Sequence, residues 1–113
     1  MVAIIENAPQ RIENAKTKYP GTRLFTNYKD FLAEKIEADI VAVATQDEDH
    51  KEHAIAMMEA GYDLLLEKPI ATSSEEVLDI YYTAKRLGRK IYVCHVLRYA
   101  PAFLKVKEIL LSV

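Results

Sequence analysis

The sequence predicts an α/β fold in which five parallel strands alternate with helices. Short apolar runs alternate along the chain with longer stretches whose apolar residues recur every three or four positions. Two of the runs, 39–44 and 62–66, are almost unbroken, which is typical of strands buried on both faces of a parallel sheet. Helical stretches between strands imply right-handed β-α-β crossovers. The five predicted strands are residues 2–5, 23–26, 39–44, 62–66 and 90–96.

The helices of the N-terminal third are predicted from their end signals. Residues 10–19 follow Pro9, which is tolerated in a first helical turn because its missing N–H has no partner there. Pro20 and Gly21 end this helix. Asn27 suits the N-cap of a short helix over 28–34, since its side-chain oxygen can accept a free backbone N–H.

Three further helices are predicted downstream. Residues 49–60 have a helical pattern, and Gly61 fits the position after the helix. Ser73 and Glu76 match a capping box, and Gly88 ends the helix that it opens. The apolar stripe of that helix is Val77, Ile80, Tyr81, Ala84 and Leu87, and a last helix from Pro101 carries Phe103, Val106 and Leu110 on one side.

Composition excludes several classes of function. The 15 Lys and Arg balance 17 Asp and Glu, so the chain has no electrostatic footprint for nucleic acid. One cysteine excludes an intrachain disulfide framework and favours a reducing, cytoplasmic location. No apolar run approaches the roughly 20 residues of a membrane span, and the start lacks the basic segment of a signal peptide. We expect a single domain over residues 1–113 with no membrane partner.

Polar residues follow the strands at one end of the predicted sheet. Ligands of open α/β sheets bind beyond the carboxyl ends of the strands, so these residues are the candidates for a site. They are Glu6 after the first strand, Thr45, Gln46, Asp47 and then His50 after the third, Glu67, Lys68 and Pro69 after the fourth, and His95, Arg98 and Tyr99 after the fifth.

Glu6 and Arg11 are candidates for binding a nucleotide. A carboxylate that ends the first strand can hydrogen-bond the ribose hydroxyls of a dinucleotide, and a solvated acid at the helix start is the alternative. Arg11 is placed to meet an adenine or a 2′-phosphate, although a helix-surface arginine is the commoner case.

The third strand ends in a loop whose backbone should face a ligand, at Thr45 and Gln46. We expect His50 to begin the next helix as a surface or capping residue rather than as a ligand contact. His53 lies three residues further on, but two histidines without a third ligand predict no metal site.

Lys68 is the sharpest candidate for chemistry. Pro69 restricts it to extended geometry, so its ammonium is held at the mouth of the sheet, where it can exchange a proton with a hydroxyl or carbonyl. A surface Glu67–Lys68 ion pair is the alternative. Cys94 is expected to be a packing thiol, whereas Arg98 with Tyr99 can bind a carboxylate, phosphate or carboxamide or else cap the turn.

Together these residues resemble the NAD(P)-binding Rossmann domain of the glucose–fructose oxidoreductase, inositol dehydrogenase and rhizopine catabolism family (Gfo/Idh/MocA). The segments that carry the resemblance are ADIVAVATQDEDHKEHAIAMMEAGYDLLLEKPIATSSEEV and GRKIYVCHVLRYAPAFLKVKEIL. The resemblance implies NAD or NADP as cofactor and hydride transfer to or from a sugar, polyol or related alcohol.

The resemblance also implies roles for individual residues. Lys68 corresponds to the catalytic lysine of the Glu-Lys-Pro motif, and Glu67 would hold it and the nicotinamide end. Glu6 would bind the ribose hydroxyls and favour NAD over NADP, whereas Arg11 is compatible with NADP as the cofactor. Lys68 is also assigned to cofactor binding. The remaining residues assigned by resemblance are Thr45, Gln46, His50, Pro69 and Arg98 for the cofactor, and His95 and Tyr99 for the substrate.

The chain departs from the family pattern in three respects. Gln46 stands where the family has proline, so that loop is expected to differ. No G-x-G-x-x-G occurs, and the first β-α unit of the family is not recognisable, so the predicted fold is an incomplete dinucleotide-binding fold. The antiparallel substrate domain of the family is likewise not recognisable.

These departures predict weak or absent dinucleotide binding and no turnover by this chain alone. Residues 2–5 and 39–44 would each lack one neighbouring strand, and open apolar edges favour pairing with another copy. The alternative function is therefore a non-catalytic α/β module that self-associates as a homo-oligomer. A flavodoxin-like domain with a receiver-type lysine ranks last, because only Glu6 supplies an acid after the first strand.

Overall fold

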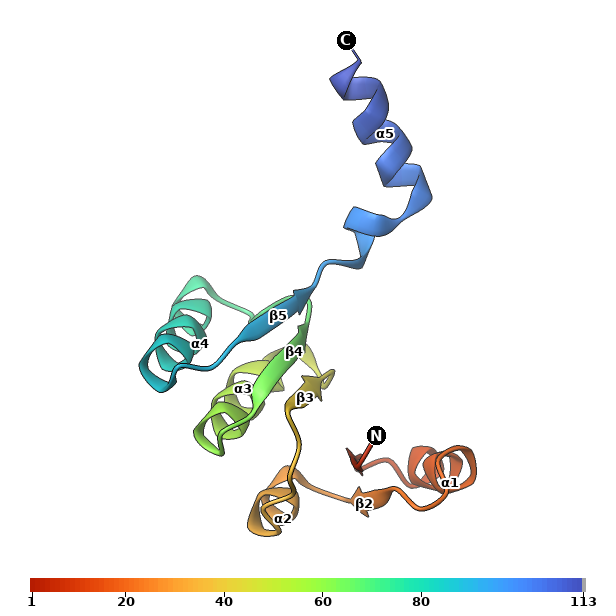
Figure 1. Ribbon diagram of the computed structural model, residues 1–113, viewed down its shortest axis with the longest axis vertical. Coiled ribbons are helices and arrows are strands. Elements are labelled where there is room, and N and C mark those ends of the chain that lie inside the picture. The colour runs from red at the N-terminus through yellow and green to blue at the C-terminus, as the bar shows by residue number, and fades with distance from the viewer. Residues whose placement is uncertain (113) are drawn as a thin grey trace.

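The computed structural model describes residues 1–112 and confirms an α/β fold with five parallel strands alternating with helices (Figure 1). Short 3-10 turns at Asp47–Asp49 and Val96–Tyr99 follow two of the strands. The strands are β1 Ala3–Ile5, β2 Arg23–Phe25, β3 Ile40–Val43, β4 Asp63–Glu67 and β5 Ile91–Cys94. The helices are α1 Pro9–Lys18, α2 Tyr28–Ala33, α3 His50–Glu59, α4 Ser74–Leu87 and α5 Pro101–Leu111.

The strands form two sheets rather than one. β1 pairs with β2, and β3, β4 and β5 form a three-stranded sheet in that order. A doubly wound sheet has the strand order 3-2-1-4-5-6, and the observed order fits it with one central position open between β1 and β3. Among residues 1–112 each of these two strands therefore has a single hydrogen-bonded neighbour, as the sequence predicted.

The helix ends form as their end signals predict, with one difference. Asn27 accepts the N–H of Asp30 at 2.9 Å, and Ser73 accepts the N–H of Glu76 at 3.2 Å. The Glu76 carboxylate does not return to Ser73; it accepts the N–H and hydroxyl of Thr72 at 3.1 and 2.7 Å. The predicted capping box is therefore half formed, and the acid ties the preceding loop to the helix instead.

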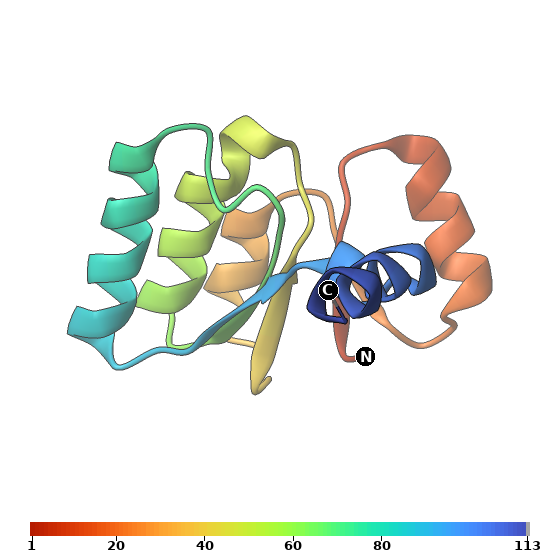
Figure 2. The same ribbon diagram turned by 90° about the horizontal axis from the view of Figure 1, so that it is seen from above.

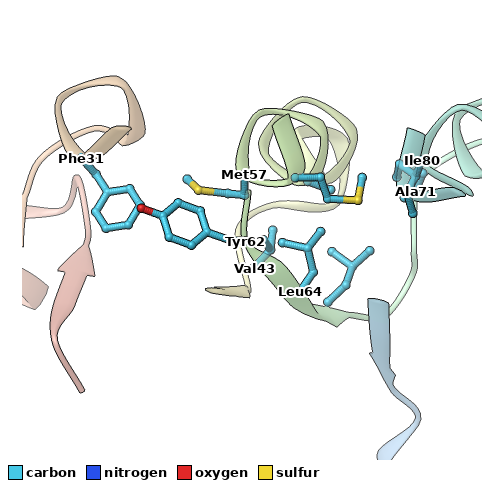
Figure 3. Packing of buried hydrophobic residues seen from close by; sticks show 11 residues of the cluster. Phe31, Val43, Met57, Tyr62, Leu64, Ala71 and Ile80 are labelled. Carbon is cyan, nitrogen blue, oxygen red and sulfur yellow. The ribbon is translucent and has the colours of Figure 1, made fainter. Parts of the chain in front are cut away.

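Three helices cover one side of the sheet region, and α1 lies on the other side (Figure 2). α3 packs on α4, on β3 and on β4, and the core lies between these elements. Met57 of α3 and Leu64 of β4 are buried in this cluster, and the ring of Tyr62 extends toward Phe31 of α2 (Figure 3). The core thus belongs to the three-stranded sheet and its helices.

The prediction that strands 39–44 and 62–66 are buried on both faces is wrong for residues 1–112. Leu64 and Leu66 are fully buried against the helices, whereas Leu65 between them is 41% exposed. Its partners in register, Ala42 and Tyr92, are exposed as well. The reason is that α2, α3 and α4 cover only one face of this sheet. The predicted apolar stripe of α4 is wrong at Tyr81, whose side chain is exposed to solvent.

The C-terminal helix extends away from the rest of the molecule (Figure 1). Every residue of α5 is exposed, including Phe103, Val106 and Leu110 of the predicted stripe. The radius of gyration is 16.8 Å, against about 13 Å for a compact domain of roughly 100 residues. Among residues 1–112 no helix is both long and apolar enough to cross a membrane.

Candidate functional site

The carboxyl ends of the strands carry the predicted site residues in two groups. Glu6 and Arg11 belong to the two-stranded sheet and α1, and all the others follow β3, β4 and β5. The open position between β1 and β3 separates the groups. No hydrogen bond or ion pair joins them within residues 1–112, so each group is held by its own part of the fold.

The Glu6 carboxylate is fixed at the start of α1. One oxygen accepts the N–H of Ala8 at 2.9 Å, and the other lies 3.5 Å from the guanidinium of Arg11. The Ala8 hydrogen bond is the main cause of a lowered pKa for Glu6, and the positive charge of Arg11 adds to it while partial burial opposes it. Glu6 therefore stays ionised as an acceptor, with its side chain 21% exposed and open to a ligand.

A hollow of about 230 Å³ opens beside Glu6 between β1 and α1. Its lining residues are Ile4, Glu6, Arg11, Asn14, Ala15, Lys18 and Tyr19. A second hollow of about 440 Å³, between the end of α2 and the turn before β4, contains none of the predicted site residues. Lys68 lines neither hollow, so the hollows do not define the chemical end of the site.

Lys68 follows β4, the middle strand of the three-stranded sheet. Its backbone N–H donates to the Glu67 carboxylate at 3.2 Å, and the Lys68–Pro69 peptide is cis. The Lys68 side chain is exposed, and within residues 1–112 its ammonium forms no ion pair. The alternative of a surface Glu67–Lys68 ion pair therefore does not form, and the ammonium is available to a ligand.

Glu67 lies in register with Cys94 on the neighbouring strand β5. Partial burial raises the pKa of the Cys94 thiol, and the adjacent Glu67 carboxylate raises it further. Cys94 is thus a protonated thiol beside a carboxylate, at an intermediate degree of burial. The expectation of a packing thiol agrees with this position, although the contact with Glu67 was not foreseen.

His50 is not the surface residue that the sequence predicts. It does begin α3, but its ring is fully buried, and Nδ1 lies 2.7 Å from the carbonyl oxygen of Pro69. The cause is the packing of α3 against β4, which turns the first residue of the helix toward the loop after that strand. His50 thereby connects the segment that follows β3 with the loop that follows β4.

Thr45 is held by a residue that sequence reasoning set aside. Its hydroxyl lies 3.0 Å from Nδ1 of His53, and the Tyr28 ring packs edge-on against the same imidazole at 4.8 Å. The two histidines of α3 therefore reach two different loops and do not converge on a metal ion. Among residues 1–112 no cluster of three or more His, Cys, Asp or Glu has the arrangement of a metal site. The three-residue spacing was the only signal available in the sequence.

The residues after β5 form an exposed 3-10 turn, Val96–Tyr99. The N–H of Arg98 donates to the carbonyl of His95 at 3.0 Å, which fixes the backbone of the turn. The side chains of His95, Arg98 and Tyr99 are all exposed, as is Gln46 after β3. The fold places these four side chains on the surface without joining them to Lys68.

The donor set fits the two ends of a dinucleotide. Glu6 is an ionised acceptor of the kind that binds ribose hydroxyls, and Lys68 is an unpaired cation at the other end. A pyrophosphate requires backbone N–H groups at a glycine turn and helix start. Within residues 1–112 the glycines are Gly21, Gly61 and Gly88, and all three serve turns or helix ends remote from such a cradle.

A parallel sheet with polar side chains at its carboxyl edge is typical of ligand-binding α/β proteins, and the strand order here fits the dinucleotide-binding fold with one position open. Residues 1–95 match the family described as the oxidoreductase family with an NAD-binding Rossmann fold, GFO_IDH_MocA. The chain belongs to this family.

Relatives and solved structures agree with that assignment. The chain is 35% identical over 111 residues to inositol 2-dehydrogenase 2 of Saccharopolyspora erythraea, covering 96% of this chain and 32% of the relative. It matches the structure of an NAD-binding protein from Listeria innocua with 32% identity and a TM-score of 0.86, over 96% of this chain and 32% of that one. The chain therefore spans about a third of the length of the relatives it matches.

One similar structure contains bound ligands. The WlbA dehydrogenase of Bordetella pertussis, in complex with NADH and UDP-GlcNAcA, is 29% identical with a TM-score of 0.76. The match covers 82% of this chain and 26% of WlbA. Binding of NADH is thus found among structures similar to this chain.

Proposed function

We propose that residues 1–113 form part of the cofactor domain of an NAD(P)-dependent oxidoreductase. The reaction would move a hydride between the nicotinamide and a carbon that bears a hydroxyl group in a sugar, polyol or related alcohol. The observation that carries this proposal is the unpaired Lys68 ammonium at the carboxyl end of the middle strand of a family Rossmann sheet. The similarity to an inositol 2-dehydrogenase supports a polyol as the substrate class.

Lys68 would act as the proton-transfer group. Bound NAD(P) would supply the hydride chemistry, and oxidation of an alcohol there would release its hydroxyl proton. Lys68 Nζ would accept that proton as the neutral amine and so become the ammonium. In the reverse direction Lys68 returns the proton to the carbonyl oxygen as hydride arrives at carbon. Glu67 supports this role because its carboxylate accepts the Lys68 N–H and so holds the backbone at the strand end.

Glu6 would bind the adenosine ribose and favour NAD over NADP. Its lowered pKa keeps a negative charge where the additional phosphate of NADP would lie, and like charges repel. Arg11 works against this preference, since its guanidinium can pair with a 2′-phosphate. The 3.5 Å pairing of Arg11 with Glu6 reduces that opposing effect. Thr45, Gln46, Pro69 and Arg98 are the remaining proposed cofactor residues, whereas His50, whose ring is fully buried, would support the loop that carries Pro69.

His95 and Tyr99 are proposed for the substrate side of the site. Both are exposed near the end of β5, beside the strand that carries Lys68. Their hydrogen-bonding groups suit a polyhydroxylated ligand, because imidazole and phenol both donate and accept. An alcohol bound between Lys68 and this turn would have its hydroxyl within reach of Nζ.

The chain alone is expected to bind dinucleotide weakly. The pyrophosphate has no glycine turn within residues 1–112, and the two ends of the site lie on separate sheets. These same open edges of β1 and β3 favour the second candidate function, a non-catalytic module that self-associates through strand pairing.

Light scattering combined with titration of nicotinamide fluorescence separates the two functions. We expect a dimer or larger species and little binding of NADH at micromolar concentrations of the chain. Weak binding that favours NADH over NADPH, and that Glu6→Gln abolishes, would support the cofactor role. Strong self-association with no binding at any accessible NADH concentration would leave the second function.

A monomer that binds NADH at micromolar concentrations would contradict the expectation that a glycine turn is required. In that case Lys68→Ala becomes the decisive variant. It should leave NADH binding within a few fold and abolish NADH oxidation with a polyol-derived ketone. Lys51→Ala is the matched control, because Lys51 of α3 pairs with Asp79 of α4 and is not among the proposed site residues.

A further inference from the structure

His50 is an unusual residue for the core of this protein. It is the single fully buried polar or charged residue among residues 1–112, with an exposure of 0%. Its Nδ1 lies 2.7 Å from the carbonyl oxygen of Pro69, and its Nε2 is buried with no hydrogen-bond partner among these residues. One ring nitrogen is thus committed to the loop after β4, and the other is left without a partner.

The contact with Pro69 determines which ring nitrogen carries the proton. A carbonyl oxygen only accepts, so Nδ1 must be the donor. In the neutral ring Nε2 then carries a bare lone pair, and this agrees with its being the unpartnered atom. The hydrogen bond therefore fixes both the tautomer and the orientation of the imidazole.

A purely packing role does not account for this residue. Burying a polar atom without a partner costs free energy, and an apolar side chain of similar volume would avoid that cost. Met57 and Met58 show that the same helix fills the core with apolar side chains elsewhere. Because Nε2 is buried without a partner, we look for the role of this residue in the hydrogen bond that Nδ1 makes.

We propose that His50 is a positioning residue that holds the Glu67–Lys68–Pro69 turn in place for proton transfer by Lys68. The inference rests on the proposed function of Lys68. The ring lies at the start of α3, and its single hydrogen bond reaches the carbonyl of Pro69, the residue after Lys68. Since the Lys68 side chain has no ion pair of its own within residues 1–112, its direction is set by the backbone on either side. Glu67 constrains one side of that backbone and His50 the other.

The tautomer gives a direct test that needs no cofactor. Long-range proton–nitrogen NMR spectra of the labelled chain should show a pyrrole-type Nδ1 and a pyridine-type Nε2 for His50. The exposed His95 provides the reference in the same spectrum. A protonated Nε2 with a bare Nδ1 would overturn the proposal.

Two amide variants separate positioning from packing. Asn places a donor nitrogen where His has Nδ1, whereas Gln places its donor one carbon further along. His50→Asn should keep the hydrogen-bonded carbonyl carbon shift of Pro69 and a backbone order parameter for Lys68 near the rigid value of about 0.85. His50→Gln should lose that shift and lower the order parameter toward about 0.6.

Met58→Ala is the control for a packing effect, because Met58 is 1% exposed on the same helix. It should lower stability while leaving the Lys68 order parameter unchanged. Equal loss of Lys68 order in the Asn, Gln and Met58 variants would overturn the proposal. If His50→Gln does not fold, the wild-type tautomer and His50→Asn still decide the question. Strong self-association with no NADH binding at any accessible concentration, the outcome that leaves the second function, would change none of these spectra.

Discussion

The two parts of this molecule are supported very differently. β3, β4 and β5 carry α2, α3 and α4 on one face. These elements and the loops between them contain every buried residue among 1–112, the first of which is Phe31. β1, β2 and α1 contain none, and every residue of β1 is half-buried. Lys68 therefore follows a strand of the well-packed three-stranded sheet. Glu6 follows β1, which has a hydrogen-bonded neighbour on one side only. Under the proposed function, this difference would make the Lys68 end of the site preformed, whereas the Glu6 end would depend on what pairs with β1.

The largest effect is expected in the packed part. Leu64→Ala removes a fully buried side chain beneath α3 and should lower the free energy of unfolding by about 3 kcal/mol. Ile4→Ala on β1 is the matched change in the other part and should cost only about 1 kcal/mol, because Ile4 is half-buried. Urea unfolding of both variants measures the comparison. Equal losses would show that the two parts are equally well packed.

Loss of the hydrogen bond between Tyr62 and the segment after α2 should have the next largest effect. The Tyr62 hydroxyl donates to the carbonyl of Ile36, in the segment that leads from α2 to β3. Tyr62→Phe removes the donor and should destabilise the protein by about 1 kcal/mol. Tyr92→Phe is the control, since Tyr92 is 53% exposed and should change unfolding by a few tenths at most. Similar losses from both variants would exclude a specific role for the hydroxyl of Tyr62.

Helix capping also favours the part that contains β3, β4 and β5, since α4 has a side-chain N-cap and α1 has none. Ser73→Ala removes the side-chain cap of α4 and should cost about 1 kcal/mol, with the neighbouring Ser74→Ala as a nearly neutral control. Ala8 starts α1 with no side-chain cap, so Ala8→Ser should instead add about 0.5 kcal/mol. Thermal unfolding resolves the opposite signs. A loss of stability in Ala8→Ser would show that Glu6 already satisfies this helix start.

The smallest expected effect is the response of the Glu6 part to acid. The Ala8 N–H and Arg11 lower the pKa of Glu6 below the ordinary 4.5. A lowered pKa in the folded state contributes stability above the unfolded value, and this contribution is lost as pH falls through the folded value. Glu6→Gln should therefore destabilise the protein at pH 7 and have less effect near pH 3. NMR titration of the Glu6 carboxyl carbon should give a midpoint below 4.5.

Arg11→Met sharpens the same measurement. It removes the nearby positive charge and leaves the Ala8 N–H, which is the larger cause of the lowered pKa. The Glu6 midpoint should rise only part of the way toward 4.5. A full return to 4.5 would show that the ion pair, and not the helix start, controls this carboxylate.

Much of the local structure was predictable because it depends on short-range signals. Asn27 and Ser73 cap their helices, and the positive φ angles of Gly61 and Gly88 occur where helices end. The open position between β1 and β3 was also predicted, because the sequence resembles the family but contains no G-x-G-x-x-G and no recognisable first β-α unit. The predicted burial of Leu65 and of the other strand residues on the same face of the sheet was wrong, because burial depends on which faces the helices cover.

The sequence by itself determined the order of strands and helices and the residues that follow each strand. Those features depend on apolar periodicity, capping side chains and turn residues, all of which act over a few positions. Only the tertiary structure decided that His50 lies buried against Pro69 and that His53 holds Thr45. The physical reason is that these relations join segments distant along the chain, and packing between elements sets which of them meet.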